Sequence, residues 1–271
     1  MPHLQPLISI IIPCYNSGQY LPDALESIKT YPDKNAYEVI IVDDGSTDQY
    51  TLNLLTKLQT EGYIIFKQEN KGPAAARNTG VSNAKAEYLL FLDSDNKIRS
   101  SYIDQGIKIL STFQDVGVVY GNPAFFGSKT EERFVTRSFD MYSILINNYI
   151  DMCSVIRKKA WQEVGGFDEA RILIGFEDWE FWIRVGAAEW KFYHVNETLF
   201  DYRVREDSVI KNALQPDKHR QMLNYVHTKH LTLFNKFYSE LYEQSCYYSN
   251  DQKKPFRSFI KYFYNKYNRK S

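Results

Sequence analysis

The chain has 271 residues, and its 33 basic and 33 acidic side chains give a formal net charge of zero at pH 7. A chain of this length accommodates one large α/β domain with a small appendage, and the balanced charge argues against nucleic acid as a partner. Aromatic residues are numerous, with 21 Tyr, 17 Phe and 4 Trp. Tyr and Trp combine a flat apolar face with a polar tip, so they suit stacking on sugars and bases as well as core packing.

The three cysteines, Cys14, Cys153 and Cys246, match no zinc-ligand spacing and cannot form a complete disulfide set. We therefore expect reduced thiols in a cytoplasmic protein. The first apolar run, at residues 7–12, is too short for a signal or membrane-spanning segment, and no longer run follows it. These features favour a cytoplasmic location, either free or peripheral at the inner face of the membrane.

Short apolar runs in the first hundred residues predict four strands. They lie at residues 8–12, 39–42, 64–66 and 88–92. Apolar side chains recur at helical spacing over residues 20–28 and 54–58, and residues 74–84 are small and favour a helix. Strands buried on both faces are almost continuously hydrophobic, and the alternation of strands and helices predicts βαβ units in a mostly parallel sheet.

The pattern is less regular in the middle of the chain. Residues 116–120 and 191–195 predict further strands, and residues 157–164 predict a helix that ends at Gly165. Residues 177–185 predict an aromatic-rich helix.

The character of the chain changes near Gln215-Pro216, after which apolar residues recur three or four apart, as in helices. We place the domain boundary there, with an α/β domain at residues 1–215 and a helical C-terminal region at residues 216–271. The tail at residues 253–271 carries seven Lys or Arg, several aromatics and no acid. It suits an anionic bilayer surface, where each cation contributes about 1 kcal/mol. A helix packed on the α/β domain with a solvated basic face is the alternative.

Polar side chains follow three of the predicted strands. The segments are Pro13-Cys14-Tyr15-Asn16, Asp43-Asp44-Gly45-Ser46 and Asp93-Ser94-Asp95. Ligands of open parallel α/β sheets bind at the carboxyl ends of the strands, so these segments predict a binding site. Helix capping would explain one acid per turn, but not Asp43-Asp44 beside Asp93-x-Asp95.

The spacing of Asp93 and Asp95 predicts a divalent cation. Residues two apart in an extended segment point the same way, and carboxylate oxygens favour Mg²⁺ or Mn²⁺, which bridge to substrate phosphates. Arg77, in the helix predicted after Gly72-Pro73, adds a positive charge unless it is an ordinary surface arginine. No G-x-G-x-x-G fingerprint follows a strand and no P-loop motif occurs, which disfavours dinucleotide oxidoreductases and P-loop enzymes.

Six segments, in this order, carry a resemblance to a known family. They are SIIIPCYNSGQYL, EVIIVDDGSTD, NKGPAAARNTG, YLLFLDSDN, VGGF and FEDWEFWIRV. Over residues 7–205 their order and spacing resemble the inverting glycosyltransferases of family 2, which have the GT-A fold. The resemblance implies an α/β, Rossmann-like and mostly parallel sheet flanked by helices, followed here by a helical C-terminal appendage.

The resemblance also implies a nucleotide-sugar donor site at the strand ends. Pro13 and Tyr15 would line the nucleotide pocket, with the Tyr15 ring against the base. Asp44 would accept a hydrogen bond from the base, and Arg77 would help to hold it.

The donor site would continue through Asp93, Ser94 and Asp95. Asp93 would contact the ribose or the metal, and Asp95 would ligate the Mg²⁺ or Mn²⁺ that bridges the diphosphate.

Asp178 matches the catalytic base of the family. An attacking sugar hydroxyl must lose its proton, which a carboxylate within hydrogen-bond reach can accept, and a single displacement inverts the anomeric centre. Without the resemblance, Asp178 would be a surface acid or a helix cap. Glu177 is the next candidate, and Trp179 is either a stacking platform for the acceptor or a core residue.

Two differences from the sequence pattern of the family limit the activity and the metal site that we expect. Processive members carry a Q-x-x-R-W signature and membrane helices, and neither occurs here, so we expect the addition of one or a few sugars. In the segment Y-R-V-R, Arg205 stands where many relatives have a histidine that can complete the metal site. Arginine cannot ligate a metal; it would bind the diphosphate or pair with Glu206 or Asp207.

The expected function is therefore non-processive, inverting transfer of a sugar from a nucleotide sugar, with UDP as the expected carrier. The acceptor would be a saccharide or lipid-linked saccharide of cell-envelope polysaccharide biosynthesis. One alternative is a sugar-nucleotide nucleotidyltransferase, although residues 13–18 lack the glycine-rich phosphate loop usual in that class. The other is a non-catalytic saccharide-binding protein, which would not need Asp178.

Overall fold

The computed structural model describes residues 5–128, 134–205 and 213–252, and the chain divides into two compact units between Leu223 and Asn224. Helix α9 (Pro216–Lys229) runs across this division, and α10 (Leu231–Gln252) belongs to the second unit. The predicted domain boundary coincides with the first residue of α9, and it stays a prediction.

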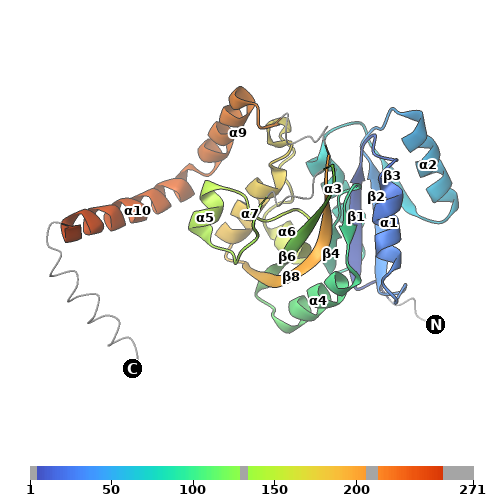
Figure 1. Ribbon diagram of the computed structural model, residues 1–271, viewed down its shortest axis with the longest axis horizontal. Coiled ribbons are helices and arrows are strands. Elements are labelled where there is room, and N and C mark those ends of the chain that lie inside the picture. The colour runs from blue at the N-terminus through green and yellow to red at the C-terminus, as the bar shows by residue number, and fades with distance from the viewer. Residues whose placement is uncertain (1–4, 129–133, 206–212, 253–271) are drawn as a thin grey trace. The chain divides into compact units, whose positions relative to one another are not determined.

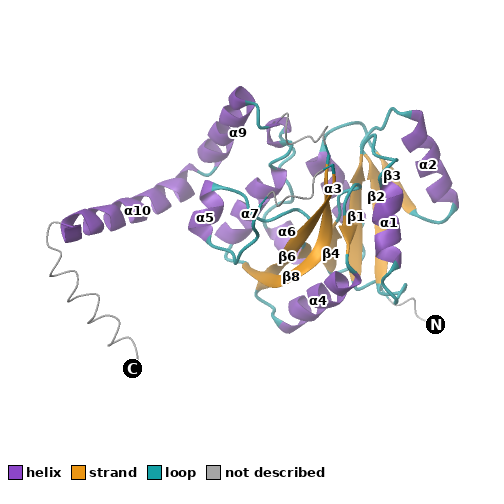
Figure 2. Cartoon of the chain, viewed as in Figure 1, coloured by secondary structure: helices purple, strands orange, loops and turns teal. Residues whose placement is uncertain are grey.

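The described strands of the first unit form one eight-stranded sheet in the order β3-β2-β1-β4-β7-β6-β8-β5 (Figure 1). The strands are β1 (Ile8–Cys14), β2 (Tyr37–Asp43), β3 (Ile64–Lys67), β4 (Tyr88–Phe91), β5 (Lys97–Ile98), β6 (Val116–Gly127), β7 (Val155–Arg157) and β8 (Lys191–Val204). The helices of this unit flank the sheet (Figure 2). They are α1 (Leu21–Lys29), α2 (Gln49–Thr60), α3 (Pro73–Asn83), α4 (Ser100–Thr112), α5 (Met141–Ile146), α6 (Lys158–Glu163), the 3-10 turn η1 (Arg171–Leu173) and α7 (Glu177–Ala187).

The first half of the sheet matches the predicted βαβ units. Strands β3, β2, β1 and β4 are parallel to one another, and the three helices predicted between them are α1, α2 and α3. Local sequence fixes where these helices begin. The Asp48 side chain caps α2 by accepting a hydrogen bond from the N–H of Thr51 (2.8 Å), and Pro73, which needs no N–H partner, begins α3.

The second half of the sheet changes direction. Strand β7 is antiparallel to both β4 and β6, whereas β8 is parallel to β6 and antiparallel to β5. Both predicted strands of this half are confirmed but are longer than expected, because register shifts around Asn122 let β6 and β8 stay paired. The helix predicted from Arg157 begins at Lys158, since Arg157 ends β7 and its buried guanidinium donates to the carbonyls of Leu110 and Val116.

Side chains of β1 alternate between two helical layers. Ile10 and Ile12 belong to a core that includes Leu25 and Ile28 of α1. Ile11 faces the other layer, where α3 packs so closely that a Cβ on Gly80 would lie 2.4 Å from the Cγ2 of Ile11. The sheet is therefore covered on both faces, as its continuous apolar runs predicted.

The second unit is helical where it is described. Within it, the rings of His227 and Phe234 lie edge to face with their centroids 4.4 Å apart. Of the helices in the described ranges, none is long and apolar enough to cross a membrane. The basic aromatic tail at residues 253–271, with its predicted membrane contact, lies outside the described residues.

Candidate functional site

The loops after β1, β2 and β4 lie together at one edge of the sheet. The Asn16 side chain, after β1, accepts hydrogen bonds from the N–H groups of Thr47 (2.7 Å) and Asp48 (3.1 Å), which follow β2. The hydroxyl of Ser17 lies 2.7 Å from that of Ser94, which follows β4. The predicted convergence of these three strand ends is therefore confirmed.

Pro13 and Tyr15, at the end of β1, differ in accessibility. Pro13 is partly buried within the strand, whereas the Tyr15 side chain is 49% exposed. An exposed ring at this edge is free to stack on a flat ligand, so the base contact remains a reasonable prediction for Tyr15.

Asp44, at the end of β2, holds the loop that leads into α3. Its carboxylate accepts hydrogen bonds from the Gln68 side chain (2.8 Å) and from the N–H groups of Lys71 (2.9 Å) and Gly72 (2.8 Å). Gly72 has a φ of 96°, which glycine adopts without strain. Asp44 is only 3% exposed, so a hydrogen bond to a base, which remains a prediction, would require the loop to open locally.

Arg77 is a buried centre of the site and not a surface residue. Its Nη1 lies 2.7 Å from Oε1 of Glu177, and its Nη2 lies 2.6 Å from Oδ1 of Asp93. Burial alone would lower the pKa of Arg77, but these two carboxylates reverse that effect and raise it. The buried Nε has no hydrogen-bond partner among the described residues. Arg77 thus links the end of β4 to the start of α7.

The Asp93-Ser94-Asp95 segment is a turn, and the expectation that it is extended is wrong. The N–H of Asn96 donates to the carbonyl of Asp93 (3.0 Å), which closes the turn. The carboxylates still influence each other, because burial raises the pKa of Asp95 and the negative charge of Asp93 raises it further.

Arg205 directly follows β8 and pairs with Asp95. Its Nη1 is 3.1 Å from Oδ2 of Asp95, and its guanidinium lies 4.7 Å from the Tyr20 ring centroid. Arg203 also lies over the Tyr20 ring (5.0 Å) and donates to the Asp95 carbonyl (2.9 Å). Two arginines therefore stand beside Asp95. The acids that follow Arg205 in the sequence, its alternative partners, lie outside the described residues.

Glu177 and Asp178 begin α7 and face different neighbours, as expected for adjacent acids. Glu177 is 6% exposed and is held by Arg77 and by the N–H of Gly175 (2.7 Å). Asp178 is partly buried and accepts a hydrogen bond from the Asn148 side chain (2.9 Å). Burial raises the pKa of Asp178 well above its usual range, and nearby carboxylates raise it further. A raised pKa makes a carboxylate a more effective proton acceptor near neutral pH.

Trp179 and Trp182 lie in the core of the domain. Trp179 is 3% exposed and Trp182 is fully buried. Their indole N–H groups donate to the backbone carbonyls of Ile144 and Ile150, respectively. The structure therefore shows the core-packing alternative for Trp179, whose ring is not presented to an acceptor.

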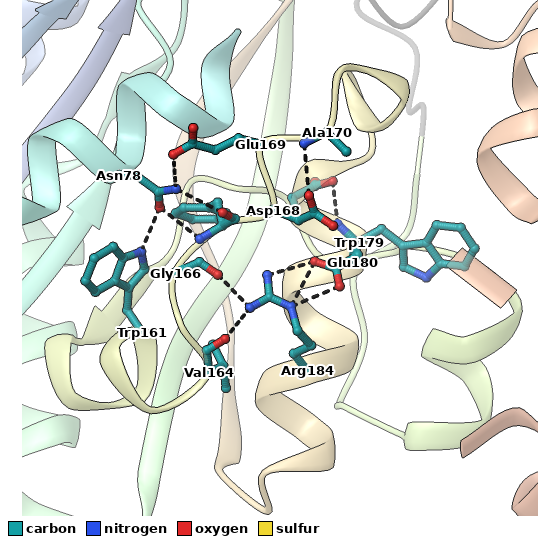
Figure 3. Close-up of polar contacts among 12 residues, drawn as sticks. Asn78, Trp161, Val164, Gly166, Asp168, Glu169, Ala170, Trp179, Glu180 and Arg184 are labelled. Atoms are coloured by element: carbon teal, nitrogen blue, oxygen red, sulfur yellow. Dashed lines mark hydrogen bonds and ion pairs between the residues drawn. The ribbon is translucent and has the colours of Figure 1, made fainter. Parts of the chain in front are cut away.

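Asn78, next to Arg77 on α3, fixes the loop between α6 and α7 (Figure 3). Its Oδ1 accepts hydrogen bonds from the Trp161 indole (3.2 Å) and the N–H of Phe167 (2.8 Å). Its Nδ2 donates to the Phe167 carbonyl (2.9 Å) and to Glu169 (2.8 Å). The amide oxygen of Asn78 accepts two hydrogen bonds and the amide nitrogen donates two, so the loop is tied to the helix that carries Arg77.

Arg184, on α7, holds the start of the same loop (Figure 3). It forms a bidentate pair with Glu180, with N–O distances of 2.7 and 2.9 Å, and donates to the carbonyls of Val164 and Gly166 (both 2.6 Å). Glu180 is fully buried. The ion pair orients the guanidinium within α7, and the bonds of the guanidinium to Val164 and Gly166 tie this helix, with the two acids in its first turn, to the loop.

Asn148 and Asp151, which precede β7, were not predicted from the sequence. The predicted site contained residues that follow strands, whereas for an antiparallel strand the residues at this edge of the sheet come before the strand. Burial and the charge of Asp93 raise the pKa of Asp151 to about 7. The short apolar run that forms β7 could have revealed both residues had its direction been known.

Comparison with known proteins identifies the family. The model of glycosyl transferase family 2 matches residues 9–167. The chain belongs to this family.

Relatives of this family 2 chain include GlyA, a glycosyltransferase of Streptococcus pneumoniae, which is 31% identical over 218 residues. The match covers 74% of this chain and 31% of GlyA, so the chain spans less than a third of that protein. A putative teichuronic acid biosynthesis glycosyltransferase of Bacillus subtilis, TuaG, is 27% identical over 226 residues, which cover 80% of this chain and 87% of TuaG.

Solved structures of glycosyltransferases share the fold of this family 2 chain. Residues 1–349 of S. aureus TarS, in complex with UDP-GlcNAc, superpose with a TM-score of 0.68 at 20% identity, covering 84% of this chain and 67% of TarS 1–349. The mannosyltransferase PcManGT of Pyrobaculum calidifontis, in complex with GDP-Man and Mn²⁺, gives a TM-score of 0.61 at 18% identity, covering 84% of this chain and 65% of PcManGT. These similarities confirm the predicted GT-A fold.

Proposed function

We propose that this chain is an inverting, non-processive glycosyltransferase that transfers a sugar from a UDP-sugar. The placement of Asp178 carries this proposal. Its carboxylate is held by Asn148, while the neighbouring Glu177 is tied through Arg77 to Asp93 at the end of β4. A basic carboxylate thus stands beside the strand edge at which α/β sheets bind their ligands. Membership of family 2 supports a glycosyltransferase over the nucleotidyltransferase alternative.

Asp178 acts as the general base in this proposal. Its carboxylate accepts the proton of the acceptor hydroxyl as the oxygen attacks the anomeric carbon, and the diphosphate leaves from the opposite face. One displacement inverts the configuration, so an α-linked donor gives a β-linked product. Asn148 donates a hydrogen bond to one oxygen of Asp178 and thereby fixes the orientation of the carboxylate for this step.

Positive charge must balance the leaving diphosphate. Arg205, beside Asp95, would bind it through its N–H groups. Within the described ranges no three His, Cys, Asp or Glu side chains are grouped as a metal site. One or two carboxylates nevertheless fit Mg²⁺ or Mn²⁺, which keep several waters and take further ligands from phosphates. Asp95 would be the first ligand and Asp93 the second; such an ion, when bound, neutralises charge on the leaving group.

The acceptor we propose is a saccharide or lipid-linked saccharide of cell-envelope polysaccharide synthesis. The name of TuaG, which refers to teichuronic acid, supports this choice. The complex of TarS with UDP-GlcNAc supports a UDP-sugar as donor.

Asp178→Asn tests the proposed base. Thermal-shift measurements with UDP-, GDP- and dTDP-sugars, with and without Mn²⁺, first identify the donor. We then expect Asp178→Asn to keep the donor-dependent thermal shift. The rates of donor hydrolysis and of sugar transfer should fall by a factor of about 10² to 10⁴. Glu163→Gln, at an exposed acid on α6, is the matched control and should retain wild-type rates.

Two results would contradict the proposal. A wild-type rate in Asp178→Asn would remove Asp178 as the base. The lack of a shift with every nucleotide sugar would remove the donor site itself, and with it the proposed function.

A further inference from the structure

Asp151 lies in the segment that joins α5 to β7, at the same sheet edge as Asp93. Strands β4 and β7 are antiparallel, with Leu90 opposite Val155, and the N–H of Phe91 donates to the carbonyl of Ser154 (3.3 Å). Past this point β4 continues forward to Asp93 while the chain before β7 continues backward to Asp151. The two carboxylates therefore belong to one end of two neighbouring strands.

The conformation of Asp151 is fixed by its own segment. Its Oδ1 accepts a hydrogen bond from the N–H of Cys153 (2.8 Å), and its backbone carbonyl accepts one from the Ser154 hydroxyl (2.8 Å). Tyr102 of α4, which is fully buried, holds the same segment by donating to the Cys153 carbonyl (2.6 Å).

The fold does not explain why this residue is charged. Among the described residues, Oδ2 of Asp151 has no hydrogen-bond partner, and no cation pairs with the carboxylate. A partly buried carboxylate that no cation balances costs free energy. An asparagine would accept the same hydrogen bond from Cys153 through its Oδ1, so packing alone favours the amide. The carboxylate therefore lowers stability relative to the amide, as groups that bind ligands often do.

Asp151 also lies within electrostatic reach of both ends of the candidate site. Asp93 and Asp95 raise its pKa in addition to burial, while Arg77 lowers it. Asp151 in turn raises the pKa of Asp178, after burial and Glu177. The same segment carries Asn148, which binds Asp178 directly. Asp151 is thus near both the proposed base and the carboxylates of the donor side.

This position determines what Asp151 would face in the proposed reaction. In a single displacement the attacking oxygen, the anomeric carbon and the leaving oxygen of the diphosphate lie in line, with the base beside the attacking oxygen. The ring of the transferred sugar lies between the base and the diphosphate, so a group near both Asp178 and Asp93 but bound to neither is placed to contact it. We propose, resting on the proposed function, that Oδ2 of Asp151 accepts a hydrogen bond from a hydroxyl of the transferred sugar and thereby selects the donor sugar.

Loss of this hydrogen bond should weaken the contact with the sugar and leave binding of the nucleotide unchanged. Sites that hydrogen-bond a substrate hydroxyl discriminate strongly against analogues that lack it, because the buried polar group is then left unpaired. We expect Asp151→Asn to bind UDP with a Kd within about twofold of wild type. For the donor that wild type prefers, kcat/KM should fall by a factor of about 10 to 100. Discrimination between donors that differ in one hydroxyl, such as UDP-glucose and UDP-galactose, should shrink by a similar factor.

Asp33→Asn is the matched control. Asp33 accepts a hydrogen bond from the N–H of Asn35 (2.9 Å), the same local bond that Asp151 makes with Cys153, but it is exposed and precedes β2, whose other end carries the site. It should change neither donor binding nor discrimination. Asp151→Ser, which is smaller than the native residue, provides a second variant, and a melting curve shows that each variant is folded.

Saturation-transfer NMR with UDP-GlcNAc gives a readout independent of turnover. Relative to the uridine protons, the sugar protons should receive less saturation in Asp151→Asn than in wild type. Unchanged sugar signals together with unchanged donor discrimination would overturn the proposal, as would an equal loss of UDP and UDP-sugar binding. Absence of UDP binding by wild type would instead refute the proposed function. That result is obtained before any Asp151 variant is measured, so the two failures can be told apart.

Discussion

Arg77 connects two acids that lie 84 positions apart in the sequence, Asp93 and Glu177, through bonds of 2.6 and 2.7 Å. Its guanidinium presents separate Nη atoms to each carboxylate, which a single ammonium group cannot do. The sequence predicted Asp93 as part of the donor site and Glu177 as the next candidate for the base, and it predicted that Arg77, which joins them, holds the base of the nucleotide. In the structure Arg77 is buried, and it holds the carboxylates of Asp93 and Glu177 in position.

Arg77→Lys should therefore destabilise the protein. One of the two carboxylates would lose its partner while partly or fully buried, at a cost of about 2–4 kcal/mol. Urea unfolding of wild type and variant measures this difference. Arg99→Lys is the control, because both members of the Arg99–Asp201 pair reach solvent, whereas Arg77 and Glu177 are buried, and its replacement should cost less than about 1 kcal/mol. A similar cost for both variants would contradict the central role of Arg77.

Asp151→Asn should alter how stability depends on pH. Asp151 has a pKa of about 7 in the folded protein, compared with about 3.9 in an unfolded chain. The folded state therefore binds the proton more tightly, and stability falls as pH rises through this window. The amide removes that loss, so the variant should gain stability relative to wild type between about pH 4 and pH 8, by on the order of 1 kcal/mol. Urea unfolding at both pH values checks this, and a pH-independent difference would refute it.

At the scale of secondary-structure elements, three residues of α3 have separate structural roles. Arg77 orders the acids, Asn78 holds the loop before α7, and Gly80 lets the helix approach β1. These residues face different partners, so a shift of the helix would disturb all three. The helix itself has few large apolar residues, and its position depends on close backbone contact.

Gly80→Ala should reveal this dependence. The added Cβ would lie 2.4 Å from the Cγ2 of Ile11, so α3 or β1 must move, at a cost of about 1–3 kcal/mol. We also expect weaker donor-dependent thermal shifts, because Arg77 moves with the helix. Ser82→Ala, at an exposed position of α3, should leave both measurements unchanged. Normal donor binding by Gly80→Ala would show that the site tolerates movement of α3.

The sequence predicted the first half of the sheet better than the second for a physical reason. Parallel strands such as β1 are buried on both faces, so their apolar runs are unmistakable, and their order follows from the βαβ connections. Strands β5 and β7 have only two and three residues, too few to show a pattern. Nothing local reveals that β7 reverses direction, so Asn148 and Asp151 could not be placed at the site.

The same limit applies to individual site residues. Asp93, Asp95 and Asp178 were found because motifs mark them, but the turn at Asp93 and the pairing of Arg205 with Asp95 depend on segments far apart in the chain. Whether Trp179 faces an acceptor or the core was likewise a question of tertiary packing, and its indole bond to Ile144 decides it.

At the scale of the whole molecule, every described residue of the candidate site precedes the division between the two units. A chain that ends at residue 230 keeps all of α9 and should fold and bind the donor like the full chain. Its donor-dependent thermal shift should match that of the full chain within error. Loss of that shift in a folded, cooperatively melting truncation would show that donor binding requires residues beyond α9.

The reversal of direction between β4 and β7 has a practical consequence for engineering. In our proposal Tyr15, Asp44, Asp93 and Asp95 come from the loops after β1, β2 and β4, whereas Asn148, Asp151, Asp178 and the diphosphate-binding Arg205 come later in the chain. A chimera that joins residues up to Asp95 of this protein to the later part of a relative would keep the contacts to the nucleotide base and the metal and exchange the others. If its nucleotide preference follows the first parent and its sugar preference the second, this junction is the place at which donor sugars can be recombined.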